Sequence, residues 1–422
     1  MNDPARAAAL DILTAALARK AGLDAALDGA ALAGLSAQDR GFARALAMTT
    51  LRRLGVIDRL LAARLQREPP ERVRMVLRLG VAQLFWLDTP AYAAVDSAVA
   101  LAGAERGARG FKALVNAVLR GLARDGAPPD DPEALAPPWL YARWRAAYGE
   151  AEALALAAVI AGEPATDLTP RDPADAAALA EALEATVLPG GSLRREARGR
   201  VEDWPGFAEG RWWVQDAAAA IPARLLDARA GETVLDLCAA PGGKALQLAA
   251  AGAEVVALDR SAPRLRRLTE SLARTGLAVE AVTANAETWH DERTFDAVLL
   301  DAPCTASGTF RRNPDVLWTL RPGDVAKLAA VQSRLLDAAA ARVKPGGRLV
   351  YCVCSLEPEE GEAQARAFLK RHPDFATAPI AASEGGAPAA SVTVDGWLRL
   401  LPHHLKRGMD GFFVARFVRA AR

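Results

Sequence analysis

The sequence predicts a multidomain protein with three folded parts: an all-α domain, a small α+β region and an α/β domain whose sheet is mostly parallel. Its 422 residues exceed what one typical core holds, which indicates two or three domains. A composition of 51% hydrophobic and 24% charged residues is typical of packed globular chains. The apolar pattern changes along the chain from a helical period to strands alternating with helices. From these changes we place the domains at residues 1–125, 139–210 and 211–422, with a linker at 126–138.

The first 125 residues predict one helix after another. Apolar residues recur every three or four positions in stretches such as "SAQDRGFARALAMTTLRRLGVIDRLLAARL" and "FKALVNAVLRGLAR", and Gly or Pro marks the joints. The next stretch, "DGAPPDDPEALAPP", is too rich in Pro and Asp to continue a helix, so we expect a linker there.

The rest of the chain predicts a mixed region followed by a layered α/β domain. After a helical stretch, "WLYARWRAAYGEAEALALAAVIA", the sequence becomes irregular and rich in Gly and Arg up to about residue 210. Beyond it, apolar strands alternate with helices, which predicts a parallel sheet covered on both faces. The predicted strands are "TVLDLCA", "AEVVALD", "AVEAVTAN", "FDAVLLDAP" and "GRLVYCVCS". Ligands of such sheets bind beyond the carboxyl ends of the strands.

The charge balance favours no particular partner. The formal net charge is +1, so contacts with a polyanion must come from local basic groups. The candidates are "RREARGR" at 194–200, "RLRR" at 264–267 and Arg311-Arg312, the last being the best placed for phosphate contacts. A solvated surface is the alternative for each.

The cysteine count and the apolar runs indicate where the protein is found. Four cysteines are too few for a disulfide framework and fit a reducing compartment, so we expect a cytoplasmic location. The amino terminus lacks the apolar core of a signal peptide, and no run reaches the length of a membrane span. We therefore expect no membrane partner.

All four cysteines follow predicted strands, which brings Cys238, Cys304, Cys352 and Cys354 to one edge of the sheet. Structural zinc sites use C-x₂₋₄-C pairs and thioredoxin-like proteins use C-x-x-C, but the close pair here is C-x-C, so we expect neither a metal nor a redox pair. Plain core packing is the alternative for Cys352 and Cys238. Because strand residues alternate, Val353 should point away from the face that its two cysteine neighbours share.

The stretch "VLDLCAAPGGKALQLA" predicts a strand, a Gly-rich turn and a helix. Gly242 and Gly243 let a ligand approach the backbone, and the helix start favours an anionic group such as a carboxylate. Asp259 ends the next strand, 23 positions after Asp236, where a carboxylate can bind a ribose. A helix cap or turn is the alternative for Asp259. The pattern is neither G-x-G-x-x-G nor a P-loop, so S-adenosylmethionine suits it better than a nicotinamide or a triphosphate.

Four ordered motifs resemble the signatures of the Sun family of RNA cytosine-5 methyltransferases. They are "DLCAAPGGK" at 236–244, "DAPCTASGTFRRNPDVLW" at 301–318, "YCVCSLEPEEGE" at 351–362 and "DGFFVARF" at 410–417. Upstream, "VLRLGVAQLFWLDTPAYAAVDSAVALA" and "FKALVNAVLR" resemble the NusB-like helical domain of the RsmB-like bacterial branch. The resemblance implies a NusB-like domain, a middle RNA-binding subdomain and a Rossmann-like methyltransferase domain that together act on 16S ribosomal RNA of the small subunit.

The resemblance also implies catalytic roles. Cytosine C5 becomes nucleophilic when a thiolate adds to C6, and Cys354 aligns with that nucleophile. Cys304 aligns with the cysteine that assists product release, and Asp301 with the group beside the cytosine N3 and amine edge. This chemistry requires the base outside its stack. Water or another group, rather than His403 or His404, is favoured as the base for the C5 proton.

The same resemblance implies a set of donor-binding residues for S-adenosylmethionine. Asp259 would hold the ribose, Asn285 the adenine amine, and Asp301 would lie nearby. Asn285 stands where the family usually has an acid, so a charge-assisted contact is lost. Lys244 could instead face the RNA or form an ion pair. The methionine part would be lined by Cys238, Ala239, Ala240, Pro241, Gly242, Gly243 and Lys244.

Other interpretations of the sequence stay open. The catalytic motifs do not choose between ribosomal RNA and tRNA, and a non-catalytic RNA-binding or antitermination-like factor with a decayed methyltransferase domain is a further alternative. The acidic "EPEEGE" after Cys354 predicts a helix start with acids in its first turn. We expect a monomer.

Overall fold

The computed structural model separates the chain into two compact units. The first unit comprises Met1–Glu163 with Phe310–Leu320, and the second comprises Pro164–Thr309 with Arg321–Arg422. The boundaries drawn from the sequence at 125, 138 and 210 stay a prediction. The structure describes residues 3–17, 22–27, 29–129, 131–196 and 199–421.

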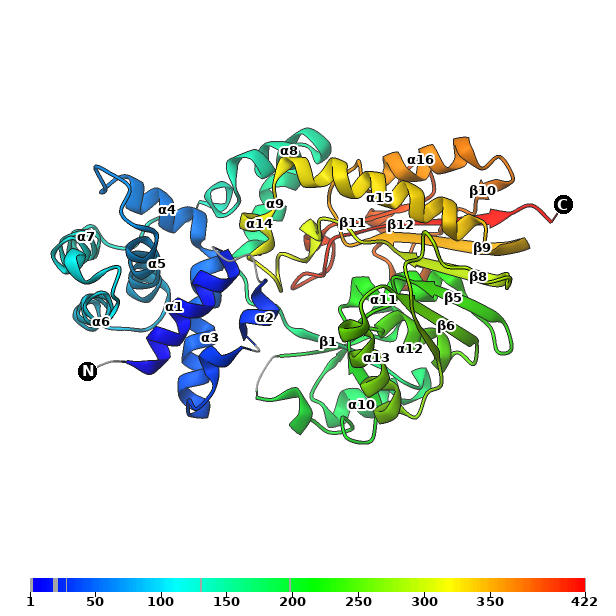
Figure 1. The fold of residues 1–422 in the computed structure, drawn as a ribbon, viewed down its shortest axis with the longest axis horizontal. Coiled ribbons are helices and arrows are strands. Elements are labelled where there is room, and N and C mark those ends of the chain that lie inside the picture. The colour runs from blue at the N-terminus through cyan, green and yellow to red at the C-terminus, as the bar shows by residue number, and fades with distance from the viewer. Residues whose placement is uncertain (1–2, 18–21, 28, 130, 197–198, 422) are drawn as a thin grey trace. The chain divides into compact units, whose positions relative to one another are not determined.

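The first unit is helical wherever it has regular structure in the described residues (Figure 1). Its α-helices are α1 (Pro4–Leu17), α2 (Leu23–Leu27), α3 (Ala37–Arg52), α4 (Leu54–Ala62), α5 (Glu71–Trp86), α6 (Ala91–Ala104), α7 (Lys112–Asp125), α8 (Pro138–Tyr148), α9 (Glu150–Ile160) and α14 (Val316–Thr319). Short 3₁₀ turns lie at η1 (Ala30–Leu32), η2 (Arg109–Phe111) and η3 (Pro132–Leu135). The helical prediction for the amino-terminal part is confirmed.

Local chemistry sets the ends of these helices. The Ser36 hydroxyl accepts a hydrogen bond from the Asp39 N–H and caps α3, as a side-chain oxygen at that position should. Gly149, at a φ of 88°, divides the stretch predicted as one helix into α8 and α9. The apolar stripes meet in one core, in which Leu10, Leu46 and Leu119 are fully buried.

The second unit contains a small antiparallel sheet in the order β2-β3-β1-β4. The strands are β1 (Thr166–Pro170), β2 (Thr186–Val187), β3 (Leu193–Arg195) and β4 (Trp212–Val214), with the helix α10 (Ala176–Ala182) and the 3₁₀ turns η4 (Pro173–Asp175), η5 (Pro189–Gly191) and η6 (Val201–Asp203). Leu168, Leu179, Leu193 and Trp212 are buried together between the helix and the strands. This is the small α+β part that the sequence predicts.

The large sheet of the second unit runs in the order β10-β12-β9-β8-β5-β6-β7, and β11 pairs with β12. Its strands are β5 (Thr233–Leu237), β6 (Glu254–Asp259), β7 (Glu280–Thr283), β8 (Phe295–Asp301), β9 (Val343–Val353), β10 (Phe375–Thr377), β11 (Leu398–Leu400) and β12 (Phe412–Arg419). The strands β5 to β9 pair in parallel, whereas β12 pairs antiparallel with β9, β10 and β11. The predicted Rossmann-like architecture is confirmed, with an antiparallel edge added.

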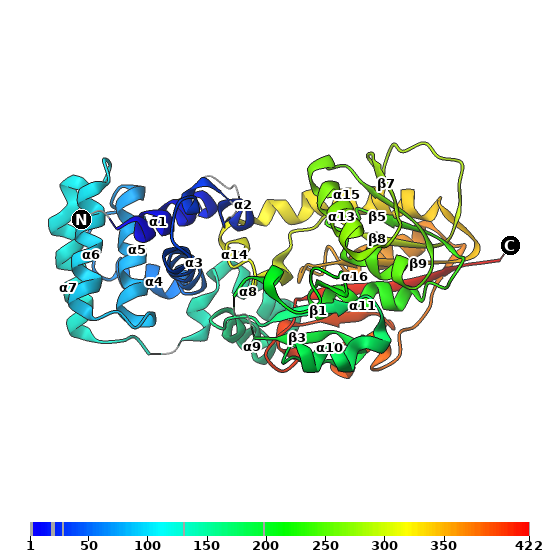
Figure 2. The same cartoon turned by 90° about the horizontal axis from the view of Figure 1, so that it is seen from below.

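Helices cover both faces of this sheet (Figures 1 and 2). They are α11 (Ala217–Leu226), α12 (Gly243–Ala250), α13 (Ala262–Thr275), α15 (Pro322–Ala340) and α16 (Glu362–Arg371), and 3₁₀ turns lie at η7 (Ser307–Thr309), η8 (Glu384–Gly386), η9 (Ala389–Ser391) and η10 (Pro402–His404). Leu299 packs with α11, α12 and α13, whereas its neighbour Leu300 packs with α15 and α16. Strand alternation therefore assigns each residue to one of two cores.

The strand order reverses between β5 and β8, where sequence neighbours no longer lie side by side. At such a switch point the connections leave the sheet in opposite directions, and ligands bind beyond the carboxyl ends of the strands. The ends of β5, β6, β8 and β9 lie at Leu237, Asp259, Asp301 and Val353. The predicted motifs are therefore carried to one edge of the sheet.

A buried ion pair joins the small sheet to the rest of the second unit. Arg194 donates through Nε and Nη2 to the two carboxylate oxygens of Asp167, at 2.7 and 2.8 Å, and through Nη1 to the carbonyl of Lys406. Asp167 also accepts the N–H of Ala217, the first residue of α11, at 3.1 Å. The two side chains are 7% and 2% exposed. Arg194 is therefore a structural residue and not a surface phosphate ligand.

Replacing Arg194 with Met should lower the free energy of unfolding by about 3 kcal/mol, because the Asp167 carboxylate stays buried without its cation. Urea unfolding followed by tryptophan fluorescence measures the change. Arg200→Met is the control, because Arg200 pairs with Glu202 while 75% exposed, and such pairs contribute at most about 1 kcal/mol. An equal decrease in the free energy of unfolding in the two variants would contradict the structural role of Arg194.

Candidate active site

The Gly-rich turn after β5 has a backbone that few residues could adopt. Gly242 has a φ of 114°, in the left-handed region, and a Cβ at this position would collide with the side chain of Leu268. α12 starts at the next residue, Gly243. The N–H of Ala239 donates to the Leu258 carbonyl at 3.1 Å, which holds the turn against the end of β6. The predicted strand, turn and helix are present.

Asp259 holds the same turn from the end of β6. Its carboxylate accepts the Ala240 N–H at 3.1 Å and the Ser261 N–H at 2.8 Å, and its side chain is 3% exposed. The carboxylate thus has the turn-forming role that we gave as the alternative to ribose binding. Two of the roughly four acceptor sites of a carboxylate are used in this way.

Lys244 forms the ion pair that we gave as one alternative to donor binding. Its Nζ lies 2.6 Å from Oδ2 of Asp301, at the end of β8, and its side chain is 9% exposed. Burial alone would lower the pKa of Lys244, but Asp301 and the neighbouring Cys352 and Asp236 outweigh burial and raise the pKa above its ordinary value. Lys244 therefore stays charged and fixes the Asp301 carboxylate.

Asp236, in β5, is a site residue that the sequence analysis did not select. It is fully buried, and neither of its carboxylate oxygens has a hydrogen-bond partner among the described residues. Burial raises the pKa of Asp236 to about 8; Lys244 opposes this shift, whereas Asp301 and Asp259 add to it. The sequence feature that could have pointed to this residue is a single acid inside the otherwise apolar strand "TVLDL".

Two of the four cysteines meet at this edge. Sγ of Cys304 lies 3.4 Å from Sγ of Cys354, although 50 residues separate them. The contact with Cys354, then burial, then the charge of Glu360 raise the pKa of Cys304 well above its ordinary value. The expectation that the strand-end cysteines approach one another is confirmed for this pair.

The other two cysteines are held in less reactive surroundings. Cys352 is fully buried and its Sγ lies 3.5 Å from Oδ1 of Asp301; burial, followed by Asp301, raises its pKa. Burial likewise raises the pKa of Cys238 to about 12. Cys352 and Cys354 pack with one core and Val353 with the other, as predicted.

The helix start predicted in the acidic stretch after Cys354 is present only at its last residue, Glu362, and the earlier acids do not belong to the first turn. α16 begins at Glu362, which pairs with Arg399, whereas Glu357 and Glu360 are buried ahead of the helix. Glu360 accepts hydrogen bonds from Thr305 and from other groups next to the cysteines. Hydrogen bonds to distant segments, and not the helix dipole, therefore account for an acid at position 360.

The remaining predicted site residues lie in different settings. Asn285 follows β7, is exposed, and accepts the Glu287 N–H through Oδ1 at 3.1 Å.

Arg311, in the first unit, is 2% exposed, so the phosphate contact suggested for it is not available at the surface. Within "RREARGR", Ala197 and Arg198 lie outside the described residues.

Comparison with known proteins identifies the family. The model for the 16S rRNA methyltransferase RsmB/F family matches residues 223–418, and the NusB family model matches residues 3–124. A "Probable ribosomal RNA small subunit methyltransferase B" of Synechocystis is 36% identical over 92% of both chains. The Ribosomal RNA small subunit methyltransferase B of Thermus thermophilus is 39% identical over 90% of this chain and 89% of that one. The chain belongs to this methyltransferase B family.

The fold agrees with that assignment. The crystal structure of PH0851 matches with a TM-score of 0.80 and 25% identity, and the match covers 99% of both chains. The resemblance that four motifs carried is thereby confirmed, as is the order of a NusB domain followed by a methyltransferase domain. In the part of the chain that the structure describes, no helix has the length and apolarity needed to cross a membrane.

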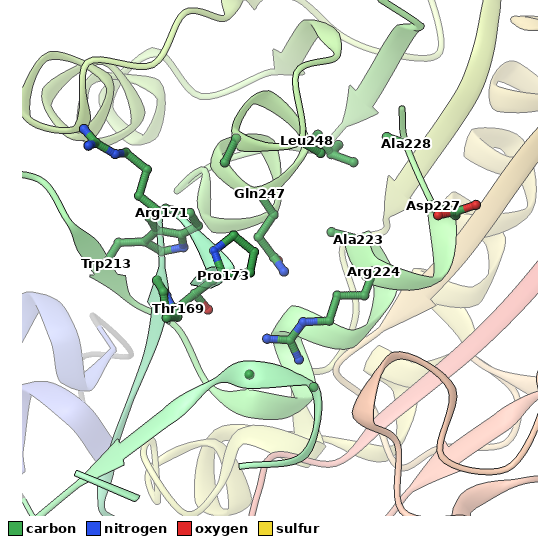
Figure 3. A pocket seen from close by; sticks show the side chains of 15 residues that line it. Thr169, Arg171, Pro173, Trp213, Ala223, Arg224, Asp227, Ala228, Gln247 and Leu248 are labelled. Carbon is green, nitrogen blue, oxygen red and sulfur yellow. The ribbon is translucent and has the colours of Figure 1, made fainter. Parts of the chain in front are cut away.

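This family member also has a cavity of about 370 Å³ away from the motif residues (Figure 3). It is lined by side chains from β1, β4, α11 and α12, among them Thr169, Trp213, Arg224 and Gln247. Arg224 donates to the Ser192 hydroxyl at 2.8 Å. None of the predicted donor-binding or catalytic residues lines this cavity. The candidate active site is the strand-end cluster, because it brings together the motif residues that follow β5, β8 and β9.

Gly308→Ala should push the loop that follows Cys304 away from the loop that precedes β12. The Gly308 N–H donates to the Cys354 carbonyl at 3.0 Å, and a Cβ at 308 would collide with the backbone of Gly411. We expect a loss of about 2 kcal/mol in the free energy of unfolding, measured by urea denaturation. Gly323→Ala, where a Cβ meets open space in α15, is the control and should be neutral or slightly stabilising. A neutral Gly308→Ala variant would rule out the close packing of these loops.

Proposed function

We propose that this protein transfers a methyl group from S-adenosylmethionine to C5 of a cytosine in 16S ribosomal RNA, through a covalent bond between Cys354 and C6. The observation that carries the proposal is the pair of thiols 3.4 Å apart beside the Lys244–Asp301 ion pair. The names of the relatives, ribosomal RNA small subunit methyltransferase B, support the choice of RNA.

The charges at the edge of the sheet suit this methyl donor. Lys244 pairs with Asp301 and the Arg264 guanidinium lies 3.8 Å from the Asp259 carboxylate, so the excess of acids at this edge is Asp236 in its ionised form. The donor carries a sulfonium, an ammonium and one carboxylate, so it is a net cation, and an excess of acids favours its binding. When bound, it supplies a methyl group on a positively charged sulfur, open to attack by a carbon nucleophile.

Each part of the donor has a candidate partner in this chain. The turn from Cys238 to Lys244 would hold the methionine part, since α12 starts at Gly243 and a helix start favours an anionic group such as a carboxylate. Asp259 keeps acceptor sites for the ribose hydroxyls beyond its two backbone contacts. The amide oxygen of Asn285 keeps a second lone pair for the adenine amine.

The cysteines would act in sequence on the cytosine ring. The Cys354 thiolate forms a bond to C6, and the ring electrons move so that C5 gains enamine character. C5 then takes the methyl group, a base removes the C5 proton, and the bond to Cys354 breaks as the thiolate leaves. Cys304 would assist this release, and Asp301 would accept from the exocyclic amine of the cytosine.

Two other functions make different predictions. A tRNA methyltransferase would use the same cysteines, but the names of the relatives and the NusB family match favour ribosomal RNA. A non-catalytic RNA-binding factor has no need for the close pair of thiols or for the Lys244–Asp301 pair. The cytoplasmic location, the monomeric state and the expectation of no metal stay predictions from the sequence.

The two cysteine variants should fail in different ways. Cys354→Ala should abolish both methyl transfer and the covalent link to RNA, because the variant lacks the thiolate that we assign to the attack on C6. In the Cys304→Ala variant, Cys354 should still attack C6, but the RNA should be released slowly. This variant should therefore accumulate a protein–RNA adduct. Mass spectrometry of 16S ribosomal RNA and denaturing gels of the mixtures measure the two results. An adduct in the Cys354 variant would reverse the assignment, and no 5-methylcytosine with wild-type protein on any RNA would refute the function.

Donor binding should strengthen as the pH rises through about 8. Asp236 is neutral below its pKa of about 8 and anionic above it, and the anionic form favours a cation. From pH 7 to pH 9 the ionised fraction of such a group rises about tenfold, so the Kd of S-adenosylmethionine should fall by up to about tenfold. Calorimetry at both pH values measures this change. Asp236→Asn should flatten the dependence, and an unchanged slope in that variant would exclude Asp236 as its cause.

A further inference from the structure

The buried carboxylate of Glu360 joins the two segments that carry the cysteines. Glu360 is 0% exposed. Its Oε1 accepts the Thr305 N–H at 3.0 Å and the Gln332 side-chain amide at 2.9 Å. Its Oε2 accepts the hydroxyls of Thr305 and Ser355, each at 2.5 Å. These groups use the full acceptor capacity of an ionised carboxylate.

The partners of Glu360 are the immediate neighbours of the thiols. Thr305 follows Cys304, and Ser355 follows Cys354. Gln332, in α15, also donates to the Pro303 carbonyl at 3.0 Å, on the other side of Cys304. One acid therefore links the residues that follow the two cysteines, in addition to the pairing of β8 with β9.

These four donors are neutral, so they orient around the negative charge of Glu360 without cancelling it. That charge acts on Cys304, where it adds to the effects of Cys354 and burial in raising the thiol pKa. The titratable groups that act on Cys304 are Cys354 and Glu360. A third group is Tyr351, whose buried hydroxyl donates to the Glu360 carbonyl. Three of the four donors to Glu360, namely the two groups of Thr305 and the amide of Gln332, hold the Cys304 segment, whereas Ser355 alone holds the Cys354 segment, so the acid acts unequally on the two segments.

We propose that Glu360 is a positioning residue that gives the two cysteines different tasks, by holding their segments together and by acting on the Cys304 segment through three of its four contacts. The proposal deepens the function inferred above and rests on it for the meaning of the two tasks. The charge effect on Cys304, however, is a property of the protein without RNA, so it can be measured separately.

The test compares Glu360→Gln with wild-type protein. Gln keeps the shape but removes the charge, and the Thr305 and Ser355 hydroxyls can rotate to accept from its amide. Each cysteine is alkylated with iodoacetamide over a range of pH without RNA, and mass spectrometry follows the separate peptides. We expect the midpoint for Cys304 to fall and Cys304 to react several-fold faster at pH 8, because the charge of Glu360 is one of the effects that raise the pKa of this thiol. Methyl transfer should lose at least about tenfold in kcat with the KM for RNA little changed, because positioning and not binding is affected.

Two further variants separate charge from packing. Glu359→Gln is the matched control, the same change on an exposed neighbour, and should alter neither the alkylation profile nor kcat. Glu360→Asp keeps the charge on a shorter side chain, so the Cys304 midpoint should stay near that of wild type while kcat falls. If Glu360→Gln fails to fold, the Glu360→Asp variant still tests whether the position of the carboxylate matters for kcat.

An unchanged Cys304 profile in folded Glu360→Gln, or an equal fall of the midpoint in Glu360→Asp, would overturn the proposal. Wild-type protein that still methylates RNA in that case would leave the proposed function standing. Conversely, a shifted Cys304 profile in a protein that methylates no RNA would uphold the effect of Glu360 on the thiol and remove the proposed function.

Discussion

The parallel pairing of β8 with β9 is the constraint on which the site depends. Asp301 pairs in register with Cys352, and the Ala302 N–H donates to the Cys352 carbonyl at 3.0 Å. The residues that follow each strand therefore leave the sheet side by side, which brings Cys304 to Cys354. A slip of one residue would turn Cys352 and Cys354 to the opposite core, because strand side chains alternate. The apolar residues on both faces of these strands oppose such a slip.

Around this pairing, the site gathers acids that the interior would ordinarily exclude. Asp301 is paired with Lys244, and Asp259 is hydrogen-bonded to the backbone. Glu360 is surrounded by four donors, whereas Asp236 has no hydrogen-bond partner in the described residues. Burying an unpaired carboxylate is costly, and groups with perturbed pKa values gather at functional sites. Asp236 lies in β5, directly before the Gly-rich turn, which agrees with the part in donor binding that we propose for it.

Much of the architecture follows from pattern alone. The helical period of the first 125 residues, and the alternation of strands and helices after 211, predict the two main folds that the structure contains. Period-two alternation also predicts that Val353 points to the opposite face from Cys352 and Cys354. This prediction needs only the local geometry of a strand. The prediction for Glu360 was wrong because the local pattern could not place this acid. An acid in "EPEEGE" has the same local pattern whether it starts a helix or is buried against a loop 55 residues away.

The sequence by itself determined the fold class, the motifs and the chemical types available at the strand ends, because these depend on local pattern and residue identity. Tertiary structure alone decided which of these groups meet: Cys304 with Cys354, Lys244 with Asp301 across 57 residues, and Glu360 with Thr305. Such contacts depend on strand order and register, which arise from the packing of the whole sheet and not from any one segment.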